Sequence, residues 1–317
     1  MKAYFKLFRW TNLLIIILLQ YLLKTAVFER FFLSQGLIFP DVDIWFALLV
    51  ASTVFVAIAG YLANDIADLE IDKINRPARV LVTGEVSIPQ ARNLQWVFEI
   101  LGVALGLSVA IYVGYYSLIT FHLLVIIAMR AYSSGVKCKG IWGNLLVAFS
   151  AAAVPALVWV FAIFVLKKQT TSIDIDFSLI NLIFLFYIGF AFIFTLIREY
   201  VKDLEDLKGD RHCGCKTMAS ILALQKSKNL VIVFNALAIQ GILLFMWLLF
   251  NRLPEGDIIV KGETLFAANF SSIIIVVLIY IIPKLIKANS SNDFHKIGNM
   301  LKIVMIAGIL QMVFLLL

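Results

Sequence analysis

Two acidic stretches of the chain carry carboxylates at the spacing of helix turns. The first, NDIADLEID, contains Asp65, Asp68 and Asp72, at spacings of three and four residues. The second, REYVKDLEDLKGDR, lies in the second half of the chain, and its acids are spaced four, three and four residues apart: Glu199, Asp203, Asp206 and Asp210. Residues three or four positions apart lie on the same face of an α-helix. The sequence therefore predicts two helical rows of carboxylates.

Two such rows could bind a divalent metal ion and, with it, a phosphorylated substrate. Two carboxylates about 4 Å apart repel each other by about 4 kcal/mol at an effective dielectric constant of about 20, so positive charge must hold them together. Oxygen ligands favour hard cations such as Mg²⁺, which usually completes its shell with water and phosphate oxygens. We therefore expect Mg²⁺ and a diphosphate here. Nearby cations could bind the remaining phosphate oxygens: Arg76, Arg79, Lys137, Arg198, Lys202 and Arg211.

Long apolar segments must position these residues. The chain has 317 residues, of which 62% are hydrophobic and only 15% are charged, whereas soluble domains are about 45–50% apolar and about 25% charged. Nine segments are long enough to span a bilayer: residues 10–32, 43–66, 93–113, 115–132, 143–166, 178–200, 229–250, 265–286 and 297–317. The sequence predicts an all-α membrane protein that forms a single transmembrane domain over residues 1–317.

The distribution of Lys and Arg predicts how the protein is oriented. With the N-terminus inside, 20 of these residues lie on the inner side and 6 on the outer side, and Lys302 lies within a helix. An excess of positive charge marks cytoplasmic loops. We therefore expect an integral, multi-pass membrane protein whose N-terminus and acidic stretches face the cytoplasm. The net charge of +7 does not indicate nucleic-acid binding, because the basic residues lie in short loops and form no continuous basic face.

The three cysteines, Cys138, Cys213 and Cys215, all lie in predicted cytoplasmic loops. Disulfides are rare in that compartment, so we expect none. His212, Cys213 and Cys215 could contribute soft metal ligands, but a structural zinc site needs a fourth ligand, and the neighbouring sequence offers none. We interpret these residues as ordinary loop residues.

Two features inside the apolar segments indicate helix packing. Gly102 and Gly106 form a G-x-x-x-G pair, which favours the close approach of another membrane helix. His122 lies in the fourth segment without a partner at ligand spacing. We therefore expect a hydrogen-bonded packing residue there and not a metal ligand.

Four parts of the sequence resemble the UbiA superfamily of intramembrane prenyltransferases. NDIADLEIDKINRPAR is similar to its N-D-x-x-D-x-x-x-D signature, and KDLEDLKGDR is similar to its second acidic motif. AYSSGVKCKGIWGN resembles a stretch in which a Tyr, a Lys and a Gly-Asn pair follow one another. Arg9 and Asn12 resemble an Arg-x-x-Asn pair of the first helix. The resemblance covers essentially the whole chain.

This resemblance implies a bundle of nine transmembrane helices around a central cavity that is open to the cytoplasmic side. It also implies an isoprenyl diphosphate bound through Mg²⁺, with a membrane-embedded acceptor. The implied metal ligands are Asn64, Asp65, Asp68, Asp72, Asp203, Asp206 and Asp210. The implied catalytic residues are Asp68, Asp72, Tyr132, Lys137, Asp206 and Asp210. The implied substrate-binding residues are Arg9, Asn12, Asn64, Arg79, Lys137, Asn144, Arg198, Lys202 and Arg211.

The acidic rows and their surroundings are compatible with three functions. EIDKINRP and KDLEDLKGDR are most similar to the digeranylgeranylglyceryl phosphate synthase branch of the superfamily, which implies prenyl transfer to the hydroxyl of a glyceryl phosphate. An aromatic acceptor of quinone biosynthesis, such as 4-hydroxybenzoate or a naphthoate, is the alternative. A cation-coupled transporter would place its ionisable residues near the membrane midplane. The acidic rows are predicted at helix ends on one side, which favours an enzyme.

Overall fold

The computed structural model describes residues 2–36, 38–75, 77, 84–169, 176–251 and 258–314. Within these ranges, nine helical segments are long and apolar enough to cross a bilayer. Each coincides with one of the nine predicted segments, so the prediction of an all-α membrane protein is confirmed. Their limits are Trp10–Ser34, Asp43–Ala67, Ile88–Val113, Tyr116–Ser133, Trp142–Lys168, Ser178–Glu205, Leu224–Phe250, Asn269–Lys287 and Ser291–Phe314.

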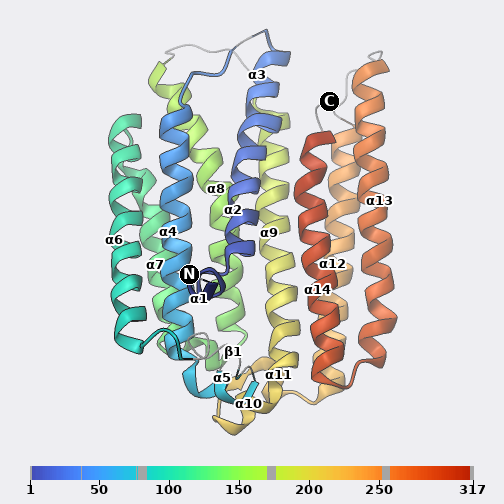
Figure 1. Ribbon diagram of the computed structural model, residues 1–317. Helices are drawn as coiled ribbons and strands as arrows, with labels where there is room; N and C mark the ends of the chain where they lie inside the picture. Colours follow the sequence, from blue (N-terminus) through green and yellow to red (C-terminus); the bar gives the residue numbers. More distant parts are fainter. Residues whose placement is uncertain are drawn as a thin grey trace.

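The long helices run side by side, and short elements cover one end of the bundle (Figure 1). The elements of the first half are α1 (Lys2–Leu7), α2 (Trp10–Leu22), the π-helix η1 (Leu23–Glu29), α3 (Arg30–Ser34), α4 (Asp43–Ala67), α5 (Leu69–Asn75), α6 (Ile88–Val113), the 3₁₀ turn η3 (Tyr116–Leu118), α7 (Ile119–Ser133), the 3₁₀ turn η4 (Val136–Cys138), β1 (Lys139–Gly140) and α8 (Trp142–Gln169). Those of the second half are α9 (Ser178–Glu205), α10 (Leu207–His212), β2 (Lys216–Thr217), α11 (Met218–Ile221), α12 (Leu224–Phe250), α13 (Ile258–Lys287), α14 (Ser291–Leu310) and the 3₁₀ turn η5 (Gln311–Phe314).

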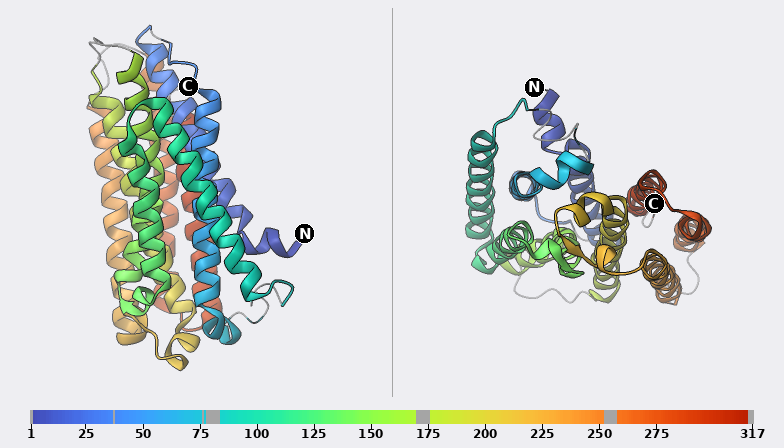
Figure 2. Two further views of the ribbon diagram at one scale, coloured as in Figure 1. Left: turned by 90° about the vertical axis from the view of Figure 1, so that its left-hand side faces the viewer. Right: turned by 90° about the horizontal axis from the view of Figure 1, so that it is seen from below.

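The view along the bundle axis shows how the acidic stretches are positioned. Helices α5 and α10 lie across the same end of the bundle, close to its centre (Figure 2, right). The preceding long helices, α4 and α9, deliver them there from different parts of the chain. The C-terminus lies at the opposite end (Figure 1). Both acidic stretches therefore meet at one end of the molecule.

Each acidic stretch contains a break in its helix, which the sequence did not predict. Helix α4 ends at Ala67, and Asp68 follows with φ −91° and ψ 7°. Helix α9 ends at Glu205, and Asp206 follows with φ −91° and ψ 3°. Aspartate is a poor helix former because its carboxylate competes for backbone groups. The two predicted helical rows are therefore each divided between two helices: each row bends at its middle aspartate, and the chain turns inward over the end of the bundle.

The packing of α6 confirms the prediction made from its two glycines. A Cβ atom on Gly102 would lie 2.8 Å from Val56 Cγ2, and one on Gly106 would lie 2.9 Å from His122 Cε1. The Nε2 atom of His122 shares a hydrogen bond of 2.8 Å with Ser52 Oγ. The expectation of a hydrogen-bonded packing histidine is thus confirmed, and α4, α6 and α7 pack closely around it.

Candidate active site

A small polar cavity of about 40 Å³ lies where the two acidic stretches meet. Its lining contains the side-chain donors expected of a metal–phosphate site: Arg9, Asn64, Asp68, Asp72, Tyr132, Lys137, Lys202, Asp203, Asp206, Asp210 and Thr217. Five of these residues are aspartates and three are Lys or Arg. Acids from α4–α5 and from α9–α10 therefore face one shared space, as the sequence predicted.

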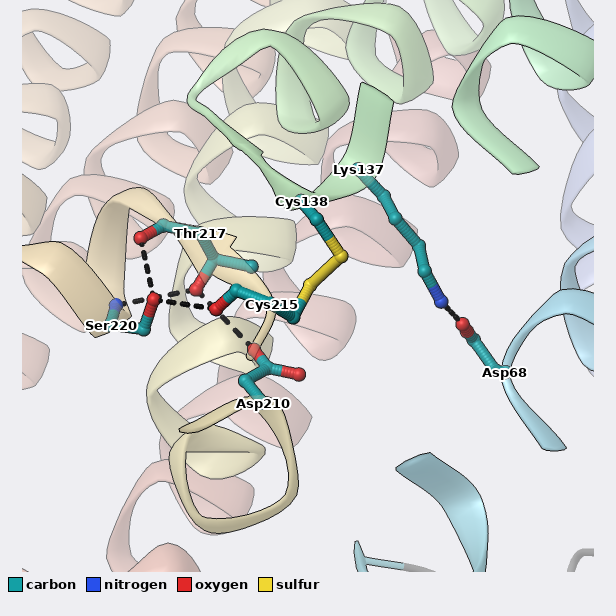
Figure 3. The surroundings of a disulfide bond; sticks show 7 residues. All are labelled: Asp68, Lys137, Cys138, Asp210, Cys215, Thr217 and Ser220. Carbon is teal, nitrogen blue, oxygen red and sulfur yellow. Dashed lines mark hydrogen bonds and ion pairs between the residues drawn. A yellow bond between two sulfur atoms is a disulfide. The ribbon is translucent and has the colours of Figure 1, made fainter. Parts of the chain in front are cut away.

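Lys137 reaches across this cavity and forms an ion pair with Asp68 (Figure 3). It lies in the short 3₁₀ turn between α7 and α8. Gly143 permits this turn to pack tightly, since a Cβ there would lie 2.6 Å from Lys137 Cα. Burial lowers the pKa of Lys137 to about 8, and the positive charge of Lys202 acts in the same direction. Lys137 is thus a cation held among acids at the centre of the site.

The second acidic stretch is fixed by two side-chain hydrogen bonds. Asn144 Nδ2 donates to Asp203 Oδ2 at 2.8 Å, and Thr217 Oγ1 donates to Asp210 Oδ2 at 3.3 Å. Burial raises the pKa of Asp210 to about 6, and the negative charge of Asp206 adds to this effect. A cation in the cavity would relieve this crowding of carboxylates.

Asn75, a residue not singled out from the sequence, joins the two acidic stretches. Its Nδ2 donates to the carbonyl oxygen of Asp206 at 2.9 Å, and its Oδ1 accepts from the backbone N–H of Gly209 at 2.9 Å. A Cβ atom on Gly209 would lie 2.6 Å from Asn75 Cγ. The close approach of α5 and α10 therefore requires a glycine at position 209.

A disulfide between Cys138 and Cys215 lies beside the cavity (Figure 3). The expectation that the chain has no disulfide is therefore wrong. The two Cα atoms are 4.7 Å apart, and β1 pairs with β2 in parallel, with Lys139 opposite Lys216. The sequence could not show that two loops 77 residues apart meet and hold their thiols together. The cross-link ties the loop of Lys137 to the loop that follows Asp210.

The disulfide leaves one of the three cysteines with a free thiol. Cys215 is engaged with Cys138, and Cys213 is free and exposed. Among the described residues, no three His, Cys, Asp or Glu side chains are arranged so that they could bind a metal by themselves. Because of the disulfide, the interpretation of Cys138 and Cys215 as ordinary loop residues is wrong, and His212 is the last residue of α10.

A larger cavity of about 770 Å³ adjoins the polar one and runs between α2, α4, α7, α8, α9 and α14. Most of its lining is apolar, including Leu19, Val154, Leu157 and Phe190. The lining residues that it shares with the polar cavity are Arg9, Asn64, Tyr132 and Lys202. Tyr132 thus lies at the junction between a polar chamber and an apolar chamber. This arrangement suits a molecule with a charged head and a hydrocarbon tail.

Arg9 reaches the junction because the backbone turns sharply between α1 and α2. Its φ of 54° lies in the left-handed region that non-glycine residues rarely adopt. The turn directs the guanidinium onto Asp65, with Nη2 at 2.5 Å from Oδ1, and over the ring of Tyr61 at 4.8 Å. Strained backbone of this kind occurs where the surrounding structure requires one geometry.

The remaining predicted site residues lie in different places. Asn12 and Arg198 line the large cavity. Asp65 is buried and lines neither of the two cavities, and its Oδ1 contacts Arg9. Arg211 is exposed outside both cavities, and Arg79 lies outside the described residues.

Several contributors, including Thr217 of the polar cavity, were not among the residues predicted to form the site. Asn75 occurs within the first motif, but its role depends on α10. Glu199 was counted in the second row, and it pairs with both Arg198 at 2.8 Å and Lys202 at 3.4 Å. Tyr61 and Lys302 line the large cavity. The sequence signal for Lys302 was the presence of a Lys inside an apolar segment.

The donor set of the polar cavity fits Mg²⁺ bound together with phosphate. Asn64, which lines this cavity, and the adjacent Asp65, which does not, each have a buried side-chain oxygen (Oδ1 and Oδ2) without a hydrogen-bond partner among the described residues. Mg²⁺ is usually bound by one or two carboxylates, with water and substrate phosphates completing the shell. That pattern agrees with aspartates which surround one space but do not form a closed metal cage.

The chain is similar to characterised proteins of one family over most of its length. The model of the UbiA prenyltransferase family matches residues 22–283. Digeranylgeranylglyceryl phosphate synthase from Sulfurisphaera tokodaii is 32% identical over 226 residues, covering 71% of this chain and 72% of that protein. The enzyme of the same name from Saccharolobus solfataricus is 32% identical over 258 residues, covering 80% and 79%.

Solved structures show the same fold. A structure from work on digeranylgeranylglyceryl phosphate synthase in membranes superposes with a TM-score of 0.62 at 22% identity, covering 98% of this chain and 96% of that one. A UbiA homologue from Archaeoglobus fulgidus bound to GPP and Mg²⁺ superposes with a TM-score of 0.58 at 14% identity, covering 98% and 99%.

Proposed function

Because the chain belongs to the UbiA prenyltransferase family, we propose that it transfers an isoprenyl group from an isoprenyl diphosphate to the hydroxyl of a glyceryl phosphate that already carries a geranylgeranyl chain. The reaction would depend on Mg²⁺. The relatives named digeranylgeranylglyceryl phosphate synthase support this acceptor.

One observation carries the proposal: the polar cavity, with its two acidic groups, continues into the large apolar cavity. A diphosphate would occupy the polar cavity, and the prenyl tail would lie in the apolar one. The reacting C1 carbon would then lie at the junction, next to Tyr132. A soluble phosphorylated substrate would not need the apolar chamber.

The acidic residues of the polar cavity would bind the diphosphate through the metal. Asn64, Asp68 and Asp72 would hold metal from one side, and Asp203, Asp206 and Asp210 would hold it from the other. The chemistry that Mg²⁺ supplies when bound is neutralisation of charge on the diphosphate oxygens.

The cations would stabilise the leaving diphosphate, and Tyr132 would position the reacting carbon. Lys137 and Lys202 would donate hydrogen bonds to diphosphate oxygens as the bond between C1 and the leaving oxygen breaks. The acceptor hydroxyl oxygen forms the new bond to C1, the diphosphate leaves with the electron pair of the broken bond, and the hydroxyl proton passes to the released diphosphate. Tyr132, at the junction, would keep C1 in place and separate it from the polar chamber.

The proposed orientation places the N-terminus and the active site in the cytoplasm. The nine apolar spans make the protein an integral, multi-pass membrane protein. This orientation is supported by the distribution of Lys and Arg: 20 lie on the side that carries the acidic stretches and 6 lie on the other side. Cysteine labelling of intact and opened vesicles through the exposed Cys213 would test it.

A product assay tests the proposed reaction. Purified protein is incubated with Mg²⁺, geranylgeranyl diphosphate and either geranylgeranylglyceryl phosphate or 4-hydroxybenzoate. We expect an ether lipid from the first acceptor, no product with EDTA, and recovery when excess Mg²⁺ is added. A ring-alkylated product without ether lipid would show that the acceptor is aromatic. Consumption of no isoprenyl diphosphate under any of these conditions would refute the proposal.

A further inference from the structure

Lys302 places a positive charge within a membrane-spanning helix. It lies in α14, inside the span Ser291–Phe314, and its half-buried side chain lines the large cavity. Ionisable residues in such helices are costly, face the protein interior and mark the paths of substrates or ions. The position of Lys302 therefore indicates that its ammonium group binds an anionic partner.

The neighbours of Lys302 do not neutralise its charge. Its Nζ donates to Asn12 Oδ1 at 3.2 Å and to Thr11 Oγ1 at 3.3 Å, and both acceptors are neutral. In the described part of the chain, no carboxylate lies within 4.0 Å of Lys302 Nζ. The charged group that acts on it electrostatically is Arg198, which is also positive.

Two other cations within spanning helices, Lys24 and Arg130, have acidic partners, whereas the buried Lys228 donates to neutral acceptors, as Lys302 does. Lys24 pairs with Glu29 and with Asp43, the latter at 2.6 Å. Arg130 binds Glu99, with Nη2 at 2.8 Å from Oε2. Lys302 differs from Lys24 and Arg130 because its two hydrogen-bond partners are neutral side chains of α2.

The cavity wall around Lys302 carries excess positive charge. Arg198 and Lys202 line the same cavity and both contact one carboxylate, Glu199. Asn12 also hydrogen-bonds Tyr61, a side chain on which Arg9 and Arg198 act electrostatically. None of Lys302, Asn12 and Arg198 lines the small polar cavity. They form a separate group of hydrogen-bond donors, away from the site assigned to the diphosphate.

We propose that Lys302, Arg198 and Asn12 bind the phosphate monoester of the lipid acceptor. This inference rests on the proposed function and adds a second anion site, next to α2 and α14. A phosphate dianion would accept hydrogen bonds from the Lys302 ammonium, the Arg198 guanidinium and the Asn12 amide. Because Tyr132 lines the same cavity, an acceptor held at this site can extend its hydroxyl to the junction. Lys302 is thereby assigned as a specificity-determining residue.

Binding without catalysis tests this site directly. In EDTA, and without prenyl diphosphate, we expect the wild type to bind geranylgeranylglyceryl phosphate at least 10-fold more tightly than geranylgeranylglycerol. Lys302→Met should weaken the affinity for the phosphorylated lipid by about 10- to 100-fold, as expected for the loss of a charge-assisted hydrogen bond. The affinity for geranylgeranylglycerol should not change, and Lys302→Arg should restore most of the loss.

The matched control is Lys296→Met, which makes the same substitution at an exposed position of α14 and should bind both lipids as the wild type does. Equal binding of the phosphorylated lipid by the wild type and Lys302→Met would overturn the assignment. Equal competition by a dialkyl phosphodiester lipid would also overturn it, because the site would then hold any lipid headgroup.

Turnover separates this inference from the proposed function. With geranylgeranyl diphosphate and Mg²⁺, Lys302→Met should raise the KM for the phosphorylated acceptor about 10- to 100-fold and leave the KM for the diphosphate unchanged. A wild type that makes no ether lipid would refute the proposed function. A wild type that makes it, with an unchanged acceptor KM in Lys302→Met, would refute only the role of Lys302.

Discussion

The side-chain amide of Asn75 contacts Gly209 through one hydrogen bond of 2.9 Å and thereby connects the two acidic stretches. The same amide donates to the carbonyl of Asp206, directly at the break between α9 and α10. The spacing of the aspartates across the metal–phosphate cavity thus depends on a neutral residue that need not touch substrate.

Asn75→Ala should lower kcat by about 10- to 100-fold. It removes two partly buried hydrogen bonds, and small displacements of catalytic groups have costs of this order. Steady-state kinetics with circular dichroism would show the loss of rate in a folded protein. Asn229→Ala, at an exposed position of α12, is the matched control. A wild-type rate in Asn75→Ala would contradict a positioning role.

Asp68→Asn and Asp206→Asn should each lower turnover more than about 100-fold at saturating Mg²⁺, because each removes a charged oxygen donor from the proposed metal site. Product formation measured against Mg²⁺ concentration would show this. Glu70→Gln alters an exposed acid of α5, paired with Lys73 at 2.6 Å, and should leave turnover unchanged. Near-wild-type rates in either aspartate variant would count against a metal role.

Lys137→Met should raise the KM for the isoprenyl diphosphate by about 10- to 100-fold. The ammonium contacts Asp68 in the cavity and is placed to bind phosphate oxygens when substrate enters. Kinetics at varied diphosphate concentration would measure the effect. Lys139→Met, two positions along and exposed, provides the comparison. Equal KM values in the two variants would exclude a diphosphate-binding role for Lys137.

Loss of the Cys138–Cys215 disulfide should reduce both stability and turnover. Cross-links of this kind contribute about 2–4 kcal/mol to the free energy of unfolding, and this one joins the loop that carries Lys137 to the loop that follows Asp210. Cys138→Ser should lower Tm by several degrees and slow turnover, and a reductant should do the same to the wild type. Cys213→Ser changes the free, exposed cysteine and should have no effect. A reduced wild type with unchanged Tm and rate would contradict this role.

Sequence patterns predicted what depends on local periodicity. Hydropathy located all nine spans, and the G-x-x-x-G pair identified the face of α6 that packs on α4 and α7. The acidic spacing found both halves of the site, and the family resemblance identified Lys137 and Tyr132 as members of it. These features are repeated or adjacent along the chain, so a single pass through the sequence detects them.

What the sequence missed depends on contacts between distant segments. The break at Asp68 and its counterpart at Asp206 depend on how α5 and α10 pack, and regular three- and four-residue spacing conceals them. Asn75 matters only because Gly209 reaches it. Lys302 was seen as a charge within a helix, but the neighbours that give it a role come from α2 and α9.

The cross-linked loops also carry information about assembly of the protein in the membrane. Cys138 and Cys215 are 77 positions apart, and the segment between them contains the whole of α8 and α9. During synthesis the two thiols can meet only after this helical hairpin has crossed the bilayer and returned. A closed S–S bond would therefore distinguish fully inserted chains from those arrested halfway, and non-reducing electrophoresis of nascent chains could follow that transition.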